Sequence, residues 1–305
     1  MKSDTLKAVI LLNAAGLLWG GNMILGHYLK DYLGPWSIIS TRLLIGGSIF
    51  ALLLMHSGEL KKLKQVRAWL LVAGLALAGV IGFQSMLYYG LRLTTSTNAG
   101  LINSLTPLLT AILVGVYFKE RLNYRHWVAA IVTIFGLAFI LAEGKLSTLL
   151  LLDFNLGDIF VLAAVISWAL YSIIGKVAMR SLSPLLMTAL GVFASLFIVV
   201  PLGIVEAVYI QPPDLTARTV LALLFISIGP TVLSLLFWNK GMNILGPARA
   251  SLFLNTVPVY IIIINAVFLG IMPYQYQWVG MILIFAGSFY AGLTAPSPVL
   301  KKERV

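Results

Sequence analysis

The side chains of this sequence that could do chemistry are placed to bind a small molecule. Two triplets share one spacing, in which an aromatic ring is followed three residues later by a polar side chain and seven residues later by glycine. Such positions lie on one face of a helix, so a ring and its polar neighbour can hold an amphipathic compound together. Packing of the rings against small residues is the alternative interpretation. The triplets are Trp19, Asn22 and Gly26, and Trp168, Tyr171 and Gly175.

Two prolines interrupt apolar stretches at matching places. Pro107 and Pro258 are each predicted near the middle of a helix, where proline removes a backbone donor and frees the carbonyl four residues earlier, at Asn103 and Leu254. Matched interruptions predict hinges beside a binding site, and a packing kink is the alternative. Asn103 and Asn255 lie on the same faces as the prolines. Each amide needs a partner in hydrocarbon, either a ligand or a neighbouring helix.

Four further side chains are candidates for the same binding site. Gln84 and Tyr88 form an i, i+4 pair, and Trp238 ends a stripe of hydroxyl side chains that either line a polar path or bond their own helix. Arg42 is the only strong charge well inside a predicted membrane segment. Either it extends to the lipid headgroups or it faces the site and attracts a carboxylate. The hydroxyl residues are Ser227, Thr231 and Ser234.

The arrangements typical of enzymes and metal centres are missing from the sequence. The chain has no Cys, and its three His and ten acidic residues are scattered without metal-ligand or nucleophile spacing. We therefore expect no catalytic residue, no metal and no cofactor. Asp158 and Glu120 are expected at helix ends, and no carboxylate is expected inside the membrane. This expectation argues against a carboxylate proton relay.

The composition is that of an all-α membrane protein. Of 305 residues, 60% are hydrophobic and 10% are charged, against about 25% charged in soluble domains. A spanning helix needs about 20 apolar residues, and ten such segments fit between short breaks rich in Gly and Pro. The expected spans are 7–28, 36–56, 67–90, 97–118, 124–142, 158–179, 184–205, 217–239, 247–270 and 274–294.

Basic residues are distributed unevenly between the two sets of loops. If the N-terminus is inside, sixteen Lys and Arg residues fall on its side and four on the other; Arg42, within a span, completes the 21. The positive-inside rule then predicts that both termini are cytoplasmic. The net charge of +11 is thereby attributed to anchoring in the lipid bilayer, and no nucleic-acid partner is expected.

The chain is a duplication. Trp19 and Trp168 begin matching segments at an offset of 149, and later pairs share an offset of 151. The predicted repeats are residues 1–145 and 154–296, with five helices each. Because five is odd, the second repeat begins on the opposite side of the membrane, so the two repeats are inverted around a shared midplane. The other pairs are Pro35/Pro184, Gly90/Gly241, Pro107/Pro258, Trp127/Trp278 and Gly136/Gly287.

The order of these signals resembles the ten-helix drug/metabolite transporter superfamily, and within it the EamA-type families. The resemblance covers nearly the whole chain. It is carried by W-G at 19–20, T-R-L-L at 41–44, F-K-E-R-L at 118–122, and the runs 88–111 and 239–259. The family's acidic residue after the fourth helix is Glu120 here, but Ile271 stands at the equivalent place after the ninth.

The resemblance implies a secondary transporter that works by alternating access in a bacterial inner membrane. It implies export of small metabolites such as amino acids or related amphipathic compounds. A facilitative channel or uniporter for small polar solutes is the alternative, and a membrane-embedded enzyme is a weaker one. The oligomeric state is left open, a monomer included.

The charge asymmetry predicts a topology that cysteine labelling can test. The native chain has no Cys, so each introduced Cys is unique. Single Cys substitutions at Lys62, Arg121 and Lys302 should react with an impermeant maleimide only after the membrane is permeabilised, and those at Lys145 and Asp214 should react in intact cells. Labelling of any of the first three from outside would refute the orientation.

Overall fold

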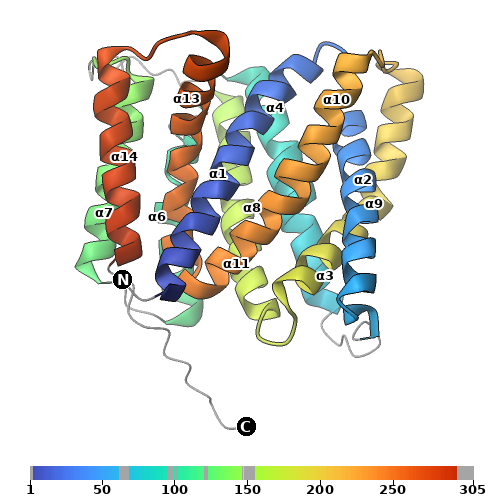
Figure 1. Cartoon of the computed structure of the whole chain (residues 1–305), viewed down its shortest axis with the longest axis horizontal. Helices are drawn as coiled ribbons and strands as arrows, with labels where there is room; N and C mark the ends of the chain where they lie inside the picture. The colour runs from blue at the N-terminus through green and yellow to red at the C-terminus, as the bar shows by residue number, and fades with distance from the viewer. Residues whose placement is uncertain are drawn as a thin grey trace.

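The computed structural model describes residues 3–61, 69–94, 99, 102–119, 123–145, 147 and 155–293; Lys62, Arg121 and Lys302 lie outside them. Figure 1 shows one bundle of helices, and no β-strand occurs among the described residues. The first half contains α1 (Ser3–Leu29), α2 (Pro35–His56), α3 (Trp69–Leu75), η2 (Ala76–Ser85), α4 (Met86–Leu93), α6 (Thr106–Phe118) and α7 (Tyr124–Leu141). The second contains α8 (Leu156–Ala178), α9 (Pro184–Tyr209), α10 (Ala217–Ile226), η4 (Ser227–Ser234), α11 (Leu235–Leu245), α12 (Pro247–Ala250), η5 (Ser251–Thr256), α13 (Val257–Leu269) and α14 (Gln275–Leu293).

These elements make ten membrane crossings. Seven stretches of continuous helix are long and apolar enough to cross a membrane, and shorter apolar helices cover Trp69–Ser85 and Ile102–Phe118. With α14 the total is ten. The predicted all-α membrane fold of two inverted five-helix repeats is thereby confirmed.

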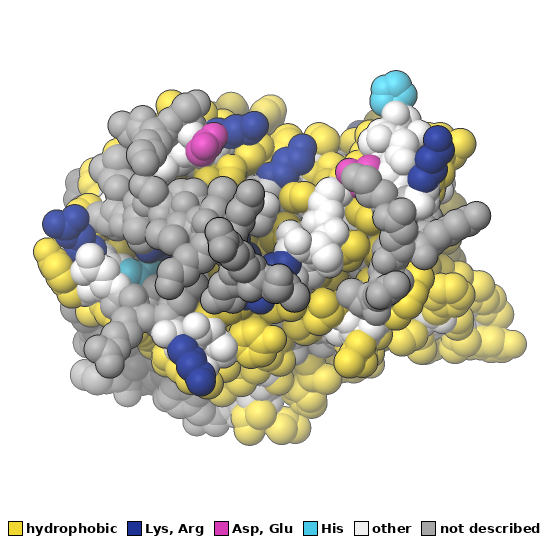
Figure 2. All heavy atoms as spheres, turned by 90° about the horizontal axis from the view of Figure 1, so that it is seen from below, with side chains coloured by type: hydrophobic (Ala, Val, Ile, Leu, Met, Phe, Trp, Pro, Cys, Tyr) yellow, Lys and Arg dark blue, Asp and Glu magenta, His cyan; other side chains and the backbone are white. Residues whose placement is uncertain are grey.

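The bundle has two ends, which we call the near end and the far end. At the near end α1 begins and α8 and α11 finish, and α1 and α4 finish at the far end (Figure 1). Figure 2 looks onto the near end and shows Lys and Arg side chains spread over it, with fewer acidic ones. This distribution is the one expected of a cytoplasmic face.

The ends of the helices reproduce the two offsets of the repeat. Helix α1 finishes at Leu29 and α8 at Ala178, an offset of 149. Helices α6 and α13 match at both ends with an offset of 151, and each is followed by a left-handed residue, Lys119 (φ 55°) or Gly270 (φ 68°). Equivalent positions in the two halves can therefore be compared residue by residue.

The third and eighth crossings both change to a π-helix midway. The π-helical segments η2 and η4 begin at Ala76 and Ser227, again 151 residues apart. They contain Gly79 and Pro230, the residues at which the sequence allows both halves to bend. Because π-helical turns are rare and are concentrated at functional sites, their recurrence marks these two crossings as specialised.

Equivalent helices pack against each other across the pseudo-two-fold axis. A Cβ added to Gly136 of α7 would lie 2.9 Å from the Gly280 carbonyl oxygen on α14. One added to Gly287 of α14 would lie 3.0 Å from the Ala129 carbonyl oxygen on α7. Since Gly136 and Gly287, and Ala129 and Gly280, are equivalent pairs, the same close contact is made twice.

The expectation that no carboxylate is buried within the membrane-spanning bundle is wrong. Helix α9 runs to Tyr209, past the expected end at 205, so it includes Glu206, which is buried. The Glu206 carboxylate accepts the Ser37 N–H at 2.8 Å, in the first turn of α2. Asp158 is also buried, but in the first turn of α8, as expected for a helix end. Both carboxylates satisfy backbone donors at helix N-termini.

The glycine contact between α7 and α14 predicts the effect of adding one methyl group. Gly136→Ala should destabilise the protein by about 1–3 kcal/mol, because the Gly280 carbonyl is backbone and cannot move aside cheaply. Gly26→Ala is the matched control, since a Cβ there meets no described atom within 4 Å. Thermal unfolding in detergent measures the difference, and equal midpoints for the two variants would refute the close packing.

Candidate functional site

Three indole rings meet at the centre of the bundle. The ring centroids of Trp19 and Trp168 are 5.7 Å apart and nearly perpendicular, and those of Trp19 and Trp238 are 5.5 Å apart. The Trp168 and Trp238 centroids are 5.8 Å apart. Trp19 and Trp168 are equivalent residues, so their contact lies on the pseudo-two-fold axis. The predicted pairing of these two tryptophans is thus a direct contact between the halves.

Most of this aromatic cluster is packed on all sides. Trp168 contacts Phe83 at 4.9 Å and stacks on Tyr171 at 5.2 Å between centroids. Trp168 and Trp238 are 7% and 0% exposed, and their indole N–H groups have no hydrogen-bond partner among the described residues. Trp19 is only partly buried. The cluster is therefore a packed group of aromatic rings in which only Trp19 remains partly accessible.

The helical face of Trp19 is open toward the far end. A Cβ added to Gly26 would meet no described atom within 4 Å, whereas one at the equivalent Gly175 would lie 3.3 Å from Met242 and 3.4 Å from Met187. Asn22, between Trp19 and Gly26, is half-buried, and no hydrogen bond joins it to another described residue. Among the described residues, this face offers a ring, an amide without a hydrogen-bond partner, and space above them.

Arg42 lies inside the bundle and does not extend to its surface. It is buried, and its Nε–H donates to the Thr231 hydroxyl at 2.9 Å. Thr231 belongs to the π-helical segment η4 and donates to the Ile226 carbonyl at 2.8 Å. Ser227 similarly bonds the Leu223 carbonyl of its own crossing at 2.6 Å. The hydroxyl stripe thus bonds mainly to its own backbone, and Thr231 also positions Arg42.

The other predicted site residues are spread around the cluster. The Gln84 side-chain oxygen and the Asn255 side-chain nitrogen are buried without a hydrogen-bond partner in the described part of the chain, so each is available to a ligand. Asn103 is half-buried. Tyr88 belongs to α4, but its side chain lies outside the described part of the structure. The structure describes no direct contact that joins these side chains to one another.

The two prolines occupy helix starts instead of helix interiors. Pro107 is in the first turn of α6 and Pro258 in that of α13, where a missing N–H costs little. The expected free carbonyls are both satisfied: Asn103 O accepts from the Thr106 hydroxyl at 2.5 Å, and Leu254 O accepts the N–H of Val257. The breaks before the prolines are real, but the prolines begin the helices that follow them.

One polar group of the core was missed by reasoning from the sequence. Asn239 of α11 is fully buried and bonds Tyr171 of α8 and Thr188 of α9. Neither its residue type nor its spacing along the helix distinguishes Asn239 from other polar residues of the sequence. The signal that could have found it is its place in the repeat, because it is equivalent to Tyr88.

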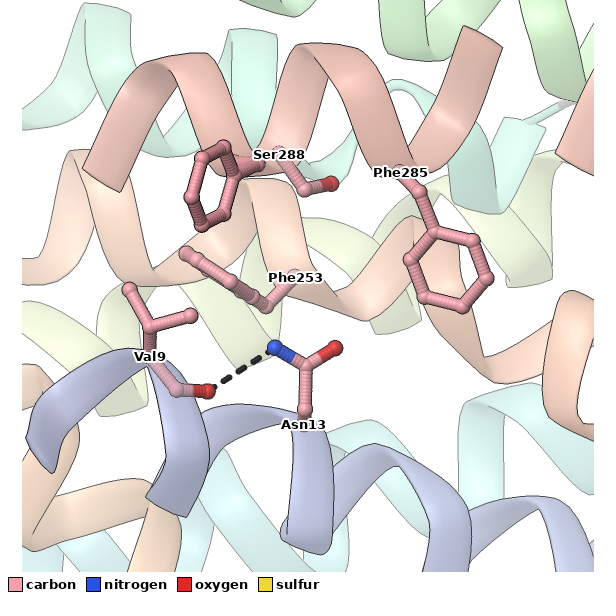
Figure 3. A pocket seen from close by; sticks show the side chains of 6 residues that line it. Val9, Asn13, Phe253, Phe285 and Ser288 are labelled. Carbon is pink, nitrogen blue, oxygen red and sulfur yellow. Dashed lines mark hydrogen bonds between the residues drawn. The ribbon is translucent and has the colours of Figure 1, made fainter. Parts of the chain in front are cut away.

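A small cavity lies apart from the aromatic cluster. It has a volume of about 180 Å³ and is lined by residues of α1, η5 and α14. Figure 3 shows the Asn13 amide donating to the Val9 carbonyl, at 2.8 Å, and Tyr260 donates to the other end of the same amide at 2.8 Å. With its polar groups satisfied, the cavity suits only an apolar group. It is lined by Val9, Asn13, Phe253, Phe285, Ser288 and Phe289.

Inverted helical bundles with matched residues at their interface define a membrane transporter. The EamA-like transporter family matches residues 6–142 and again residues 155–293, so the chain belongs to this family. The chain is 24% identical over 282 residues to the uncharacterized transporter YyaM of Bacillus subtilis, covering 92% of each chain. It is 25% identical over 300 residues to YetK of the same organism, covering 95% of this chain and 88% of that one. A solved crystal structure shares the fold with a TM-score of 0.76 at 21% identity, covering 94% and 97% of the two chains.

The different burial of the tryptophans predicts different effects of removing them. Trp238→Ala should cost about 3–5 kcal/mol of folding free energy, because the ring is completely buried in the core and its removal leaves a cavity. Trp19→Ala should cost clearly less, since part of that ring already faces open space. Chemical denaturation in detergent measures both values. Equal losses would place Trp19 in the packed core and remove it from the candidate site.

Proposed function

We propose that this membrane transporter is a secondary carrier that exports small amphipathic metabolites, such as amino acids, by alternating access. Its two halves, residues 1–145 and 154–296, would move around the aromatic cluster, with Pro107 and Pro258 as hinges. We place it in a bacterial inner membrane with both termini in the cytoplasm. The single observation that carries the proposal is the Trp19 face, which is open toward the far end and closed toward the near end.

The chemistry of the site favours an amphipathic substrate. The accessible part of Trp19 offers apolar surface, and Asn22 beside it offers both a donor and an acceptor. The unpartnered N–H groups of Trp168 and Trp238 lie beneath, where a rearrangement of the rings would present them to an acceptor. Arg42 adds a fixed positive charge between the α2 and η4 segments. An amino acid combines the apolar and charged groups that such a site can hold.

Closure at one end favours a carrier over a channel. A channel needs a continuous path, whereas the rings of the cluster are in mutual contact and Trp238 is fully buried. The near-end residues Asn239 and Gly175 are packed as well. A bundle that opens to one side at a time must alternate to move a solute.

Transport by reconstituted protein tests the proposal. Purified protein in proteoliposomes should take up radiolabelled aromatic and branched-chain amino acids with a rate that saturates, because each turnover requires a conformational change. Trp19→Ala should raise the half-saturating concentration by about tenfold while the protein stays folded, with a smaller loss of stability than Trp238→Ala. The matched control is Trp69→Ala, because Trp69 is exposed on α3 and has no place in the site.

Two outcomes would contradict the proposal. Uptake that rises linearly with concentration would indicate a channel. Equal half-saturation for native protein and Trp19→Ala would remove Trp19 from the substrate path.

A further inference from the structure

Helices α2 and α9 are joined at the far end by a cap that one helix supplies to the other. The N-cap residue of α2 is Gly34, which has no side chain to accept the free N–H groups of the first turn. Glu206 of α9 takes this role, because its carboxylate accepts the Ser37 N–H at 2.8 Å. A Cβ added to Gly34 would overlap the Glu206 carboxyl group. The carboxylate therefore occupies the space in which a capping side chain would lie.

The near end of the same pair of helices has a second carboxylate at the equivalent place. Ser183 is the N-cap of α9 and, at an offset of 149, the counterpart of Gly34. Its hydroxyl accepts the Leu186 N–H at 3.1 Å and donates to the carboxylate of Glu59, which lies three residues after the end of α2. Each helix thus begins at a Glu from the C-terminal end of the other. We call these two contacts the α2–α9 clasps: Glu206 with Ser37 at the far end, and Glu59 with Ser183 at the near end.

Between the clasps the two helices pack closely. Near the far end, the Ser37 hydroxyl donates to the Gly203 carbonyl of α9 at 3.4 Å, and a Cβ added to Gly203 would overlap the Ser40 side chain. Midway along α2, a Cβ added to Gly47 would lie 3.4 Å from the Leu196 side chain of α9. The helices are therefore in contact at both ends and in the middle, on the side of the bundle opposite α7 and α14 (Figure 1).

Closure at both ends in one state distinguishes this contact from one that opens for substrate. In alternating access, helices that gate the path separate at one end in one state and at the other end in the next. The far-end clasp is closed while a Cβ added to Gly26, which is also near the far end, would meet no described atom within 4 Å. The space above Trp19 therefore exists without any separation of α2 from α9.

The far-end clasp is also costly to open. Glu206 and Ser37 are both buried, so separation of the helices would leave a carboxylate and a backbone N–H unpaired in the interior. The penalty for such a loss is larger when one partner is charged than when both are neutral. Because α2 belongs to the first repeat and α9 to the second, the clasps resist any separation of the two repeats along this side.

We infer that α2 and α9 form a fixed pair, which stays closed at both ends throughout the transport cycle while the other helices of the two halves move about it. The inference rests on the proposed alternating access and goes beyond it by naming the contact between the halves that does not open. Glu206 and Glu59 act as positioning residues, because they hold helices and need not touch substrate.

Covalent bridges in place of the clasps test whether the pair must open. The native chain has no Cys, so Ser37→Cys with Glu206→Cys and Glu59→Cys with Ser183→Cys each introduce two thiols, at the far and near ends respectively. A short bifunctional methanethiosulfonate reagent joins them, and mass spectrometry measures the bridged fraction. In proteoliposomes, the bridged protein should take up radiolabelled phenylalanine at a rate within about twofold of the same protein before bridging.

Reagent-treated Glu59→Cys alone is the matched control for chemical modification without a bridge. A loss of about tenfold or more on bridging either end would show that the pair opens there, and would overturn the inference. Amino acid uptake that is absent before bridging contradicts the proposed substrate instead, and the inference is then decided by a measurement that needs no substrate.

That measurement is the distance between spin labels at the two ends of the pair. Nitroxide labels are attached to Cys at exposed positions, Met55 and Ser181 for the near end and Asp31 and Tyr209 for the far end. Double electron–electron resonance of purified protein in lipid nanodiscs should give one distance population for each pair. Two populations at either end of the otherwise native chain would contradict a fixed pair.

A double variant separates the tie between the helices from the capping of α2. Gly34→Ser with Glu206→Ala gives α2 its own Ser cap, as Ser183 gives α9, and removes the carboxylate that joins the two helices. The far-end distance should become longer and broader, while the near-end distance, held by Glu59, stays unchanged.

Ser195→Ala is the matched control for the double variant. Ser195 is buried on α9, but its hydroxyl donates to the Gly191 carbonyl of its own helix at 2.7 Å, so both distances should stay as in the native chain. A far-end distance that is the same in the double variant as in the native chain would show that Glu206 does not hold the pair, and would overturn the inference.

Discussion

Contacts between equivalent helices are the constraint on which this bundle depends. Helix α7 packs on α14, α2 packs on α9, and Trp19 meets Trp168 where the pseudo-two-fold axis passes between them. In such an arrangement each contact occurs twice, so a residue that permits close approach must be supplied by both halves. Gly136 and Gly287 fulfil that condition for α7 and α14. The packing of α7 on α14 therefore uses the matching glycine of each repeat.

Irregular backbone within the described crossings keeps its hydrogen bonds. Hydrocarbon has no water to satisfy a freed N–H or C=O, so helices can break only where other protein groups take over the bond. Before α6, the Asn103 carbonyl accepts a hydrogen bond from the Thr106 hydroxyl. Before α13, the 3₁₀ segment η5 is followed by a backbone bond from the Val257 N–H to the Leu254 carbonyl. The π-helical segments η2 and η4 recur at equivalent places. Both halves thus have the same two interrupted crossings, the ones that a moving half would bend.

The parts of this structure that depend on local sequence could be predicted, and those that depend on pairs of distant residues could not. Hydrophobic length and the repeat offsets were sufficient for ten inverted helices and for the pairing of Trp19 with Trp168. Amphipathic spacing identified Tyr171 but not Asn239, because an Asn near a helix end has no periodic signal of its own. The burial of Glu206 was missed for a simpler reason: the expected span ended at residue 205, whereas α9 continues through Glu206 to Tyr209.

A transporter with two identical halves would have equal energies in its two access states, so its preference must come from departures from symmetry. The structure has several of these near the axis. Trp238 is equivalent to Leu87, so the third ring of the cluster comes from the second half alone. Arg42 is equivalent to Gly191, and the Thr231 that binds it is equivalent to Val80. Each departure adds polar or aromatic contacts on one side of the axis only. Because one kcal/mol shifts a two-state equilibrium about fivefold, a few such contacts would be enough to give the proposed carrier one preferred orientation when it is empty.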